Sequence, residues 1–84
     1  MNNSIDNLIV MANQIGAFFE TQPGREESQA SIANHIRNFW EPRMRASLLQ
    51  FLEQHPNGAS ESVALAPFTL EAITRHMDSL RPRV

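Results

Sequence analysis

The sequence predicts an all-α fold, a small bundle of three to four short helices with a proline corner at Pro42. Three observations support it. Apolar residues recur at helical spacing in four segments of the chain. Strand signals are weak, because tyrosine is absent, valines are few and apolar–polar alternation is short. The 84 residues suffice for one domain, so we predict a single helical domain over residues 1–84.

The first predicted helix covers residues 4–21, with Ser4 as its N-cap. Gly16 costs roughly 1 kcal/mol relative to alanine inside a helix, which predicts that another backbone approaches closely there. Met11 and Phe18 lie off the main apolar stripe, and we predict a second contact strip at these two residues. The main stripe consists of Ile5, Leu8, Ile9, Ala12, Ile15, Gly16 and Phe19.

The second and third predicted helices cover residues 26–40 and 42–54. Pro42 separates them, because proline lacks an amide hydrogen and restricts the residue before it. At the first position of a helix proline is well tolerated. A single kinked helix is the alternative, since helical phase continues across the proline through Ile36, Trp40, Met44, Leu48 and Phe51.

Residues 55–66 form the predicted loop, and the last predicted helix covers residues 67–80. Leu65 and Leu70 occupy the positions of a hydrophobic staple around the start of this helix. Its apolar stripe consists of Leu70, Ile73, Met77 and Leu80.

Composition argues against chemistry within this chain. It has no cysteine, which removes disulfides, thiolate metal sites and cysteine nucleophiles. Its three histidines lack metal-binding spacing, and no phosphate loop or catalytic serine motif is present. We therefore predict no catalytic, cofactor-binding or metal-binding residue. The net charge of −2 argues against nucleic-acid binding. With no signal-peptide pattern and no membrane-spanning segment, we expect a cytoplasmic protein.

Residues 35–45 predict a protein-binding surface. This segment holds the only tryptophan, a phenylalanine, a proline and three of the seven arginines. Aromatic residues and arginine dominate binding hot spots, and clustered guanidinium groups repel each other unless an anionic partner is present. Trp40 could equally fill the core of the chain itself. The candidate partner-binding residues are Arg37, Phe39, Trp40, Pro42, Arg43, Met44 and Arg45, with Met11 and Phe18 as the second strip.

Several motifs of this sequence together resemble one family. They are Ile5-Asp6-Asn7-Leu8, Met11-Ala12-Asn13-Gln14-Ile15-Gly16, Phe18-Phe19, Ile32-Ala33-Asn34-His35-Ile36, Phe39-Trp40-Glu41-Pro42-Arg43-Met44-Arg45 and Leu65-Ala66-Pro67-Phe68. In order and spacing they are similar to the small delta subunit of NAD-dependent, molybdenum-containing formate dehydrogenases. The sequence departs from the family pattern at Ala66, where Ser or Thr is frequent, and at Gly24, where Asp is frequent.

The resemblance implies a non-catalytic accessory subunit of a soluble cytoplasmic complex. It implies that this chain binds and stabilises the alpha subunit, which carries bis-molybdopterin guanine dinucleotide and iron–sulfur clusters. Beta and gamma subunits would carry FMN, NAD and further clusters. This chain would hold no cofactor and contact no small-molecule substrate, nucleic acid or membrane. The alternatives are a transient cofactor-maturation chaperone, an unrelated helical interaction module such as a dimer or DNA reader, and a very small cofactor-free enzyme.

Overall fold

The computed structural model describes residues 4–82 and confirms the all-α fold. The described residues contain no β-strand, only an isolated bridge between Ala59 and Ala64 in the loop. The helices are α1 (Ile5–Glu20), α2 (Arg25–Phe39), α3 (Pro42–Gln54), α4 (Pro67–Arg75) and α5 (Met77–Leu80).

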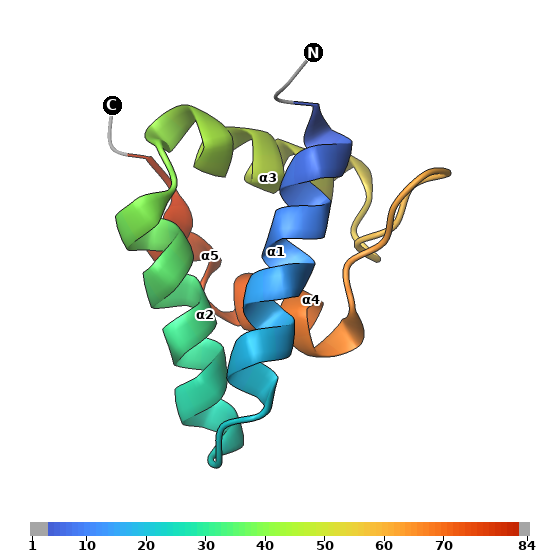
Figure 1. Ribbon diagram of the computed structural model, residues 1–84. Coiled ribbons are helices and arrows are strands. Elements are labelled where there is room, and N and C mark those ends of the chain that lie inside the picture. Colours follow the sequence, from blue (N-terminus) through green and yellow to red (C-terminus); the bar gives the residue numbers. More distant parts are fainter. Residues whose placement is uncertain (1–3, 83–84) are drawn as a thin grey trace.

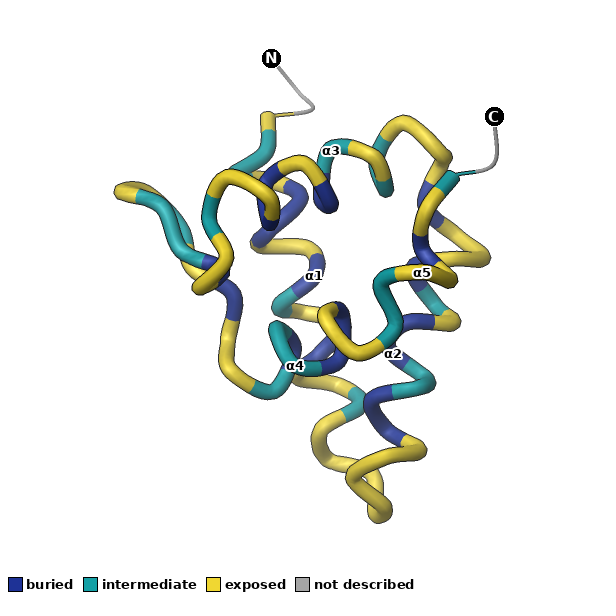
Figure 2. Tube along the Cα trace, turned by 180° about the vertical axis from the view of Figure 1, so that it is seen from behind, coloured by how far each residue is buried: buried dark blue, intermediate teal, exposed yellow. Residues whose placement is uncertain are grey.

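Helices α1 and α2 run antiparallel and are joined by a short turn, while α3 crosses above them and α4 and α5 lie behind (Figure 1). Buried positions lie on the inner sides of the helices, and the α1–α2 turn is exposed (Figure 2). One apolar cluster fills the interior, and its fully buried members include Ile9, Ile32, Ile36, Leu48, Ile73 and Leu80.

Gly16 lets α4 pack closely against α1. A Cβ atom at this position would overlap Oγ1 of Thr69 and lie 3.0 Å from its Cβ. Thr69 is buried on α4. The expected close approach therefore exists, but the partner is a side chain of α4 where the sequence had suggested a backbone.

Asn13 fixes the segment that leads into α4. Its Nδ2 donates to the carbonyl of Ala64 at 2.9 Å, and its Oδ1 accepts from the amide of Ala66 at 2.8 Å. Ala66 is the N-cap residue of α4 and offers no side-chain cap. One side chain of α1 thus satisfies two backbone groups of an otherwise irregular segment and sets where α4 begins.

The proline corner is a true break between two helices. Trp40 (φ −88°, ψ 138°) and Glu41 (φ −65°, ψ 155°) are both extended, and α3 begins at Pro42. A single kinked helix, the alternative left open by the sequence, is excluded.

The final predicted helix is divided at His76, contrary to the single helix expected over residues 67–80. His76 adopts φ −116° and ψ 26°, and its amide donates to the carbonyl of Ile73 at 3.2 Å, one residue nearer than in an α-helix. The division lets α5 turn so that Leu80 is fully buried. Arg45 of α3 then donates from Nη1 to the carbonyl of Leu80 at 3.2 Å.

Charged residues join α2 to α4 at the surface. Glu71 pairs with Arg25 and, at 3.7 Å, with Arg75, which also lies 3.9 Å from Glu26. The hydrogen bond from Arg25, followed by one from the Gln29 side chain, holds the pKa of Glu71 below its usual range. The ionised form of Glu71 is therefore favoured by folding.

We expect Gly16→Ala to lower the free energy of unfolding by about 1–2 kcal/mol. Overpacking costs about 1–3 kcal/mol, and the better helix propensity of alanine offsets part of it. Chemical denaturation of the purified chain measures the change. In a Thr69→Ala background the overlapping oxygen is gone, so the loss caused by Gly16→Ala should shrink. An equal loss in both backgrounds would contradict the assigned contact.

We expect Glu71→Gln to flatten the acid side of the stability–pH curve. Since the folded state lowers the pKa of Glu71, its contribution is present above the pKa of the unfolded state and is lost as pH falls through the folded value. The unfolded carboxyl titrates at about pH 4.5. Thermal unfolding between pH 7 and pH 3 measures the effect. Glu53→Gln removes one carboxyl at an exposed site on α3 and is the matched control. An equal change of the curve in both variants would contradict the assigned role of the Glu71 contacts.

Candidate partner interface

The structure exposes most of the predicted partner-binding residues. Among residues 4–82, Phe39 and Phe18 are the most exposed large apolar residues, at 73% and 62%. Met44 and Arg45 are half-buried. The remaining exposed members are Met11, Arg37, Pro42 and Arg43.

Trp40 belongs to the core, with 5% of its surface exposed. Its amide still donates to the carbonyl of Ile36 at 2.9 Å, while its extended backbone ends the helix. The indole joins the apolar cluster that contains Ile36 and Leu48. The expectation of Trp40 as a surface anchor is thereby corrected in favour of the core alternative.

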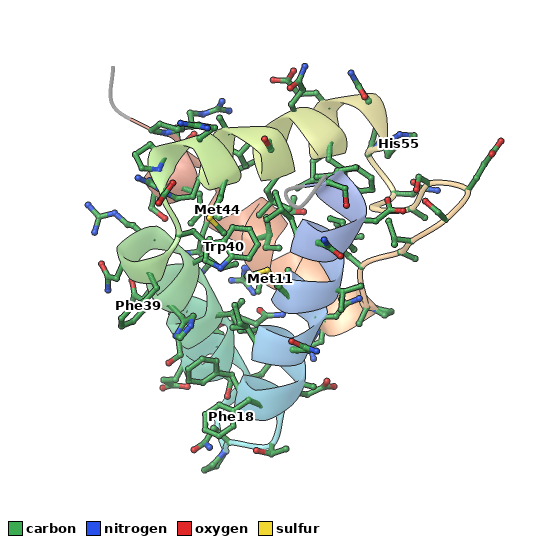
Figure 3. All side chains as sticks on the ribbon, turned by 45° about the horizontal axis from the view of Figure 1, so that its top comes forward. Met11, Phe18, Phe39, Trp40, Met44 and His55 are labelled. Atoms are coloured by element: carbon green, nitrogen blue, oxygen red, sulfur yellow. The ribbon has the colours of Figure 1, made fainter. Side chains whose placement is uncertain are left out.

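Four aromatic rings form a continuous row across α1 and α2, which we call the aromatic row: Phe18, Phe19, His35 and Phe39. The centroids of Phe18 and Phe19 lie 5.0 Å apart with an interplanar angle of 80°. His35 lies 6.2 Å from Phe19 and 4.7 Å from Phe39. The two ends of the row, Phe18 and Phe39, project outward in Figure 3.

The row has an apolar hollow at its α1 end. This hollow of about 310 Å³ is lined by Gln14, Ile15, Phe18, Phe19 and His35. Met11 continues the same face of α1, because Met11, Ile15 and Phe18 are spaced four and three residues apart. Met11 is 38% exposed. The surface thus offers ring edges for contact and a recess for an apolar side chain.

The three arginines around the corner do not form one cluster. Arg37 and Arg45 line a hollow together with Arg81. Arg43 lines a separate, smaller hollow with Glu41 and Met44. Arg45 is partly used within the chain, because it donates to the carbonyl of Leu80.

The predicted partner-binding residues do not include Phe19, His35 or Arg81, which the structure places on these surfaces. His35 could have been found, because it precedes Phe39 by four residues and therefore shares its helix face. Phe19 belongs to the predicted buried stripe, whereas the structure leaves it half-buried. Arg81 gave no local signal, since its place beside Arg37 depends on the division of the last helix at His76.

The side chains in residues 4–82 offer no group of three His, Asp or Glu that could hold a metal ion. Within the same residues, no helix has the length and apolar character needed to cross a membrane. The arrangement provides an aromatic and apolar face and, at the end of α2, a guanidinium-lined hollow. Aromatic residues and arginine are enriched in protein–protein interfaces.

Comparison with protein-family models matches residues 7–73 to the family described as NADH-dependent formate dehydrogenase delta subunit, FdsD. No curated protein and no solved structure matches the chain. The matched residues include the aromatic row, the proline corner and most of α4. On this match, which covers more than half of the sequence and agrees with the motif resemblance, the chain belongs to the family of NADH-dependent formate dehydrogenase delta subunits.

Proposed function

We propose that this chain is a non-catalytic accessory subunit that binds and stabilises the molybdenum-bearing alpha subunit of a formate dehydrogenase. A delta subunit is by definition one part of a multi-subunit enzyme, and beta and gamma subunits complete the proposed complex. The observation that carries the proposal is the aromatic row, whose two end rings remain 62% and 73% exposed on a chain of only 84 residues.

Exposure of these rings is unfavourable unless a partner covers them. Full burial of one phenylalanine side chain stabilises a protein or complex by about 1.5–3 kcal/mol relative to leaving it exposed. Because Phe18 and Phe39 are mostly exposed, a partner that covers them would gain most of this free energy at each ring. The hollow beside Phe18 and Phe19 can receive an apolar side chain from the partner. Pro42 and Arg43 are exposed beside Phe39 along the chain and remain expected contacts.

We also propose that the chain holds no cofactor. It has no cysteine to ligate an iron–sulfur cluster. The molybdenum centre, iron–sulfur clusters, FMN and NAD would all belong to the partner subunits. No pair of side chains in the aromatic row forms a nucleophile and base, which supports a role in assembly over one in the reaction. A cytoplasmic location, implied by the family resemblance, remains a prediction.

We expect the double variant Phe18→Ser/Phe39→Ser to weaken association with the alpha subunit by more than 2 kcal/mol, roughly 30-fold. The reason is the loss of both end rings of the aromatic row. Isothermal titration calorimetry with purified alpha subunit measures the affinity. Both rings are exposed, so the thermal unfolding midpoint of the isolated variant should stay close to that of the wild type.

Val10→Ser is the matched control, because Val10 is an exposed apolar residue of α1 outside the aromatic row. It should bind with nearly unchanged affinity. Unchanged affinity of the double variant would refute the proposed surface.

The composition of the purified active enzyme distinguishes a permanent subunit from a transient maturation factor. We expect one delta chain per alpha chain. Absence of the delta chain from the active enzyme would indicate a maturation factor.

A further inference from the structure

A polar hollow lies between the C-terminal end of α2, the N-terminal end of α3 and the end of α5. Its volume is about 530 Å³. Three different parts of the fold contribute to its wall, including Arg37, Asn38, Pro42, Arg45, Asp78 and Arg81. We call it the arginine hollow.

The arginine hollow is positive on a chain whose net charge is negative. Among residues 4–82, three guanidinium groups and a single carboxylate, that of Asp78, line this hollow, although the whole chain carries a charge of −2. Like charges brought together around one recess repel each other, and Asp78 compensates only one of them. The described part of the chain therefore leaves the positive charge of the hollow only partly neutralised.

The individual arginines differ in how far they are already engaged. Arg37 has no ion pair within residues 4–82. Arg81 pairs with Asp78 at 3.4 Å in an exposed position, which is a weak interaction. Arg45 is held in place by its bond to the carbonyl of Leu80, and its Nε is buried without a hydrogen-bond partner. Among the described residues, the wall thus combines the guanidinium of Arg45, which is held in place, with that of Arg37, which has no ion pair.

We propose that the arginine hollow receives a carboxylate-bearing segment of the alpha subunit. This inference rests on the proposed function, because it names the chemistry that the partner presents at a second place on the same interface. Guanidinium groups form bidentate, charge-assisted hydrogen bonds with carboxylates. The negative charge of the exposed Asp78 at the rim of the hollow disfavours a phosphate dianion more than a single carboxylate, and the acidic net charge disfavours a nucleic acid.

The hollow and the aromatic row both adjoin the C-terminal end of α2. Arg37 and Phe39 belong to the last turn of this helix, but two residues apart they point to different sides of it. A partner that buries Phe39 therefore has to extend around the end of α2 to reach the hollow. The aromatic row would supply most of the affinity, and the carboxylate would fix the orientation of the subunit.

The absence of lysine from this chain allows a direct test. Arg37→Lys places the only side-chain amine of the protein in the hollow. A carbodiimide joins an amine to a carboxylate only when the two are in contact. In the complex with the alpha subunit, we expect a cross-link from Lys at position 37 to one Asp, Glu or C-terminal carboxylate of alpha, identified by mass spectrometry.

Arg75→Lys is the matched control. Arg75 pairs with Glu26 near the opposite end of α2, roughly 16 Å along that helix from Arg37. It should give no cross-link to alpha. A yield from position 37 no greater than that from position 75, in a complex that still forms, would overturn the arginine hollow as a carboxylate site. Failure of the wild-type chain to bind alpha at all would instead refute the proposed function.

An affinity measurement gives an independent readout. We expect Arg37→Gln to weaken binding to alpha about tenfold at low salt, and the difference from wild type to shrink at high salt. Arg75→Gln removes the same charge elsewhere and should have little effect. Equal affinities of the two variants, or tight binding of inorganic phosphate that competes with alpha, would contradict a protein carboxylate as the occupant.

Discussion

The missing amide hydrogen of Pro42 determines where α2 ends and α3 begins, and with it which side chains around the corner are buried. In an uninterrupted helix, residue 42 would donate to the carbonyl of Asn38, and proline cannot. The chain therefore leaves the helix at Trp40 and Glu41, which are extended, and starts again as α3. This reversal turns the indole of Trp40 into the core and leaves Phe39 outside. It also brings two arginines on either side of the corner to one hollow.

The position of α4 depends on contacts with α1. Gly16 makes room for Thr69, and the Asn13 side chain holds the segment just before α4 through two hydrogen bonds. The ion pair of Arg25 with Glu71 adds a surface link between α2 and α4. With α4 held in this way, the turn at His76 directs α5 back toward α3, and the rim of the arginine hollow is completed. The packing of α4 against α1 in the interior thus determines the surface at the arginine hollow.

Helical segments, caps and the proline corner could be predicted because each depends on residues close in sequence. The Ser4 cap and the start of α3 at Pro42 are examples. The break at His76 could not be predicted, because the local sequence there contains neither glycine nor proline and the helical spacing continues through Met77 and Leu80. Burial of Leu80 favours the break, and that gain exists only in the packed molecule.

By itself, the sequence determined the all-α class, the corner and the family, since spacing, proline chemistry and ordered motifs are all properties of the linear chain. It also predicted a candidate interface around residues 35–45, and this stays a prediction. Only the tertiary structure decided which aromatic residues are available: Trp40 is buried, whereas Phe18 and Phe39 end a row of rings contributed by two helices. The tertiary structure likewise places Arg81 in the wall of the same hollow as Arg37. The physical reason is that exposure and proximity depend on how distant segments pack, and no local pattern encodes that packing.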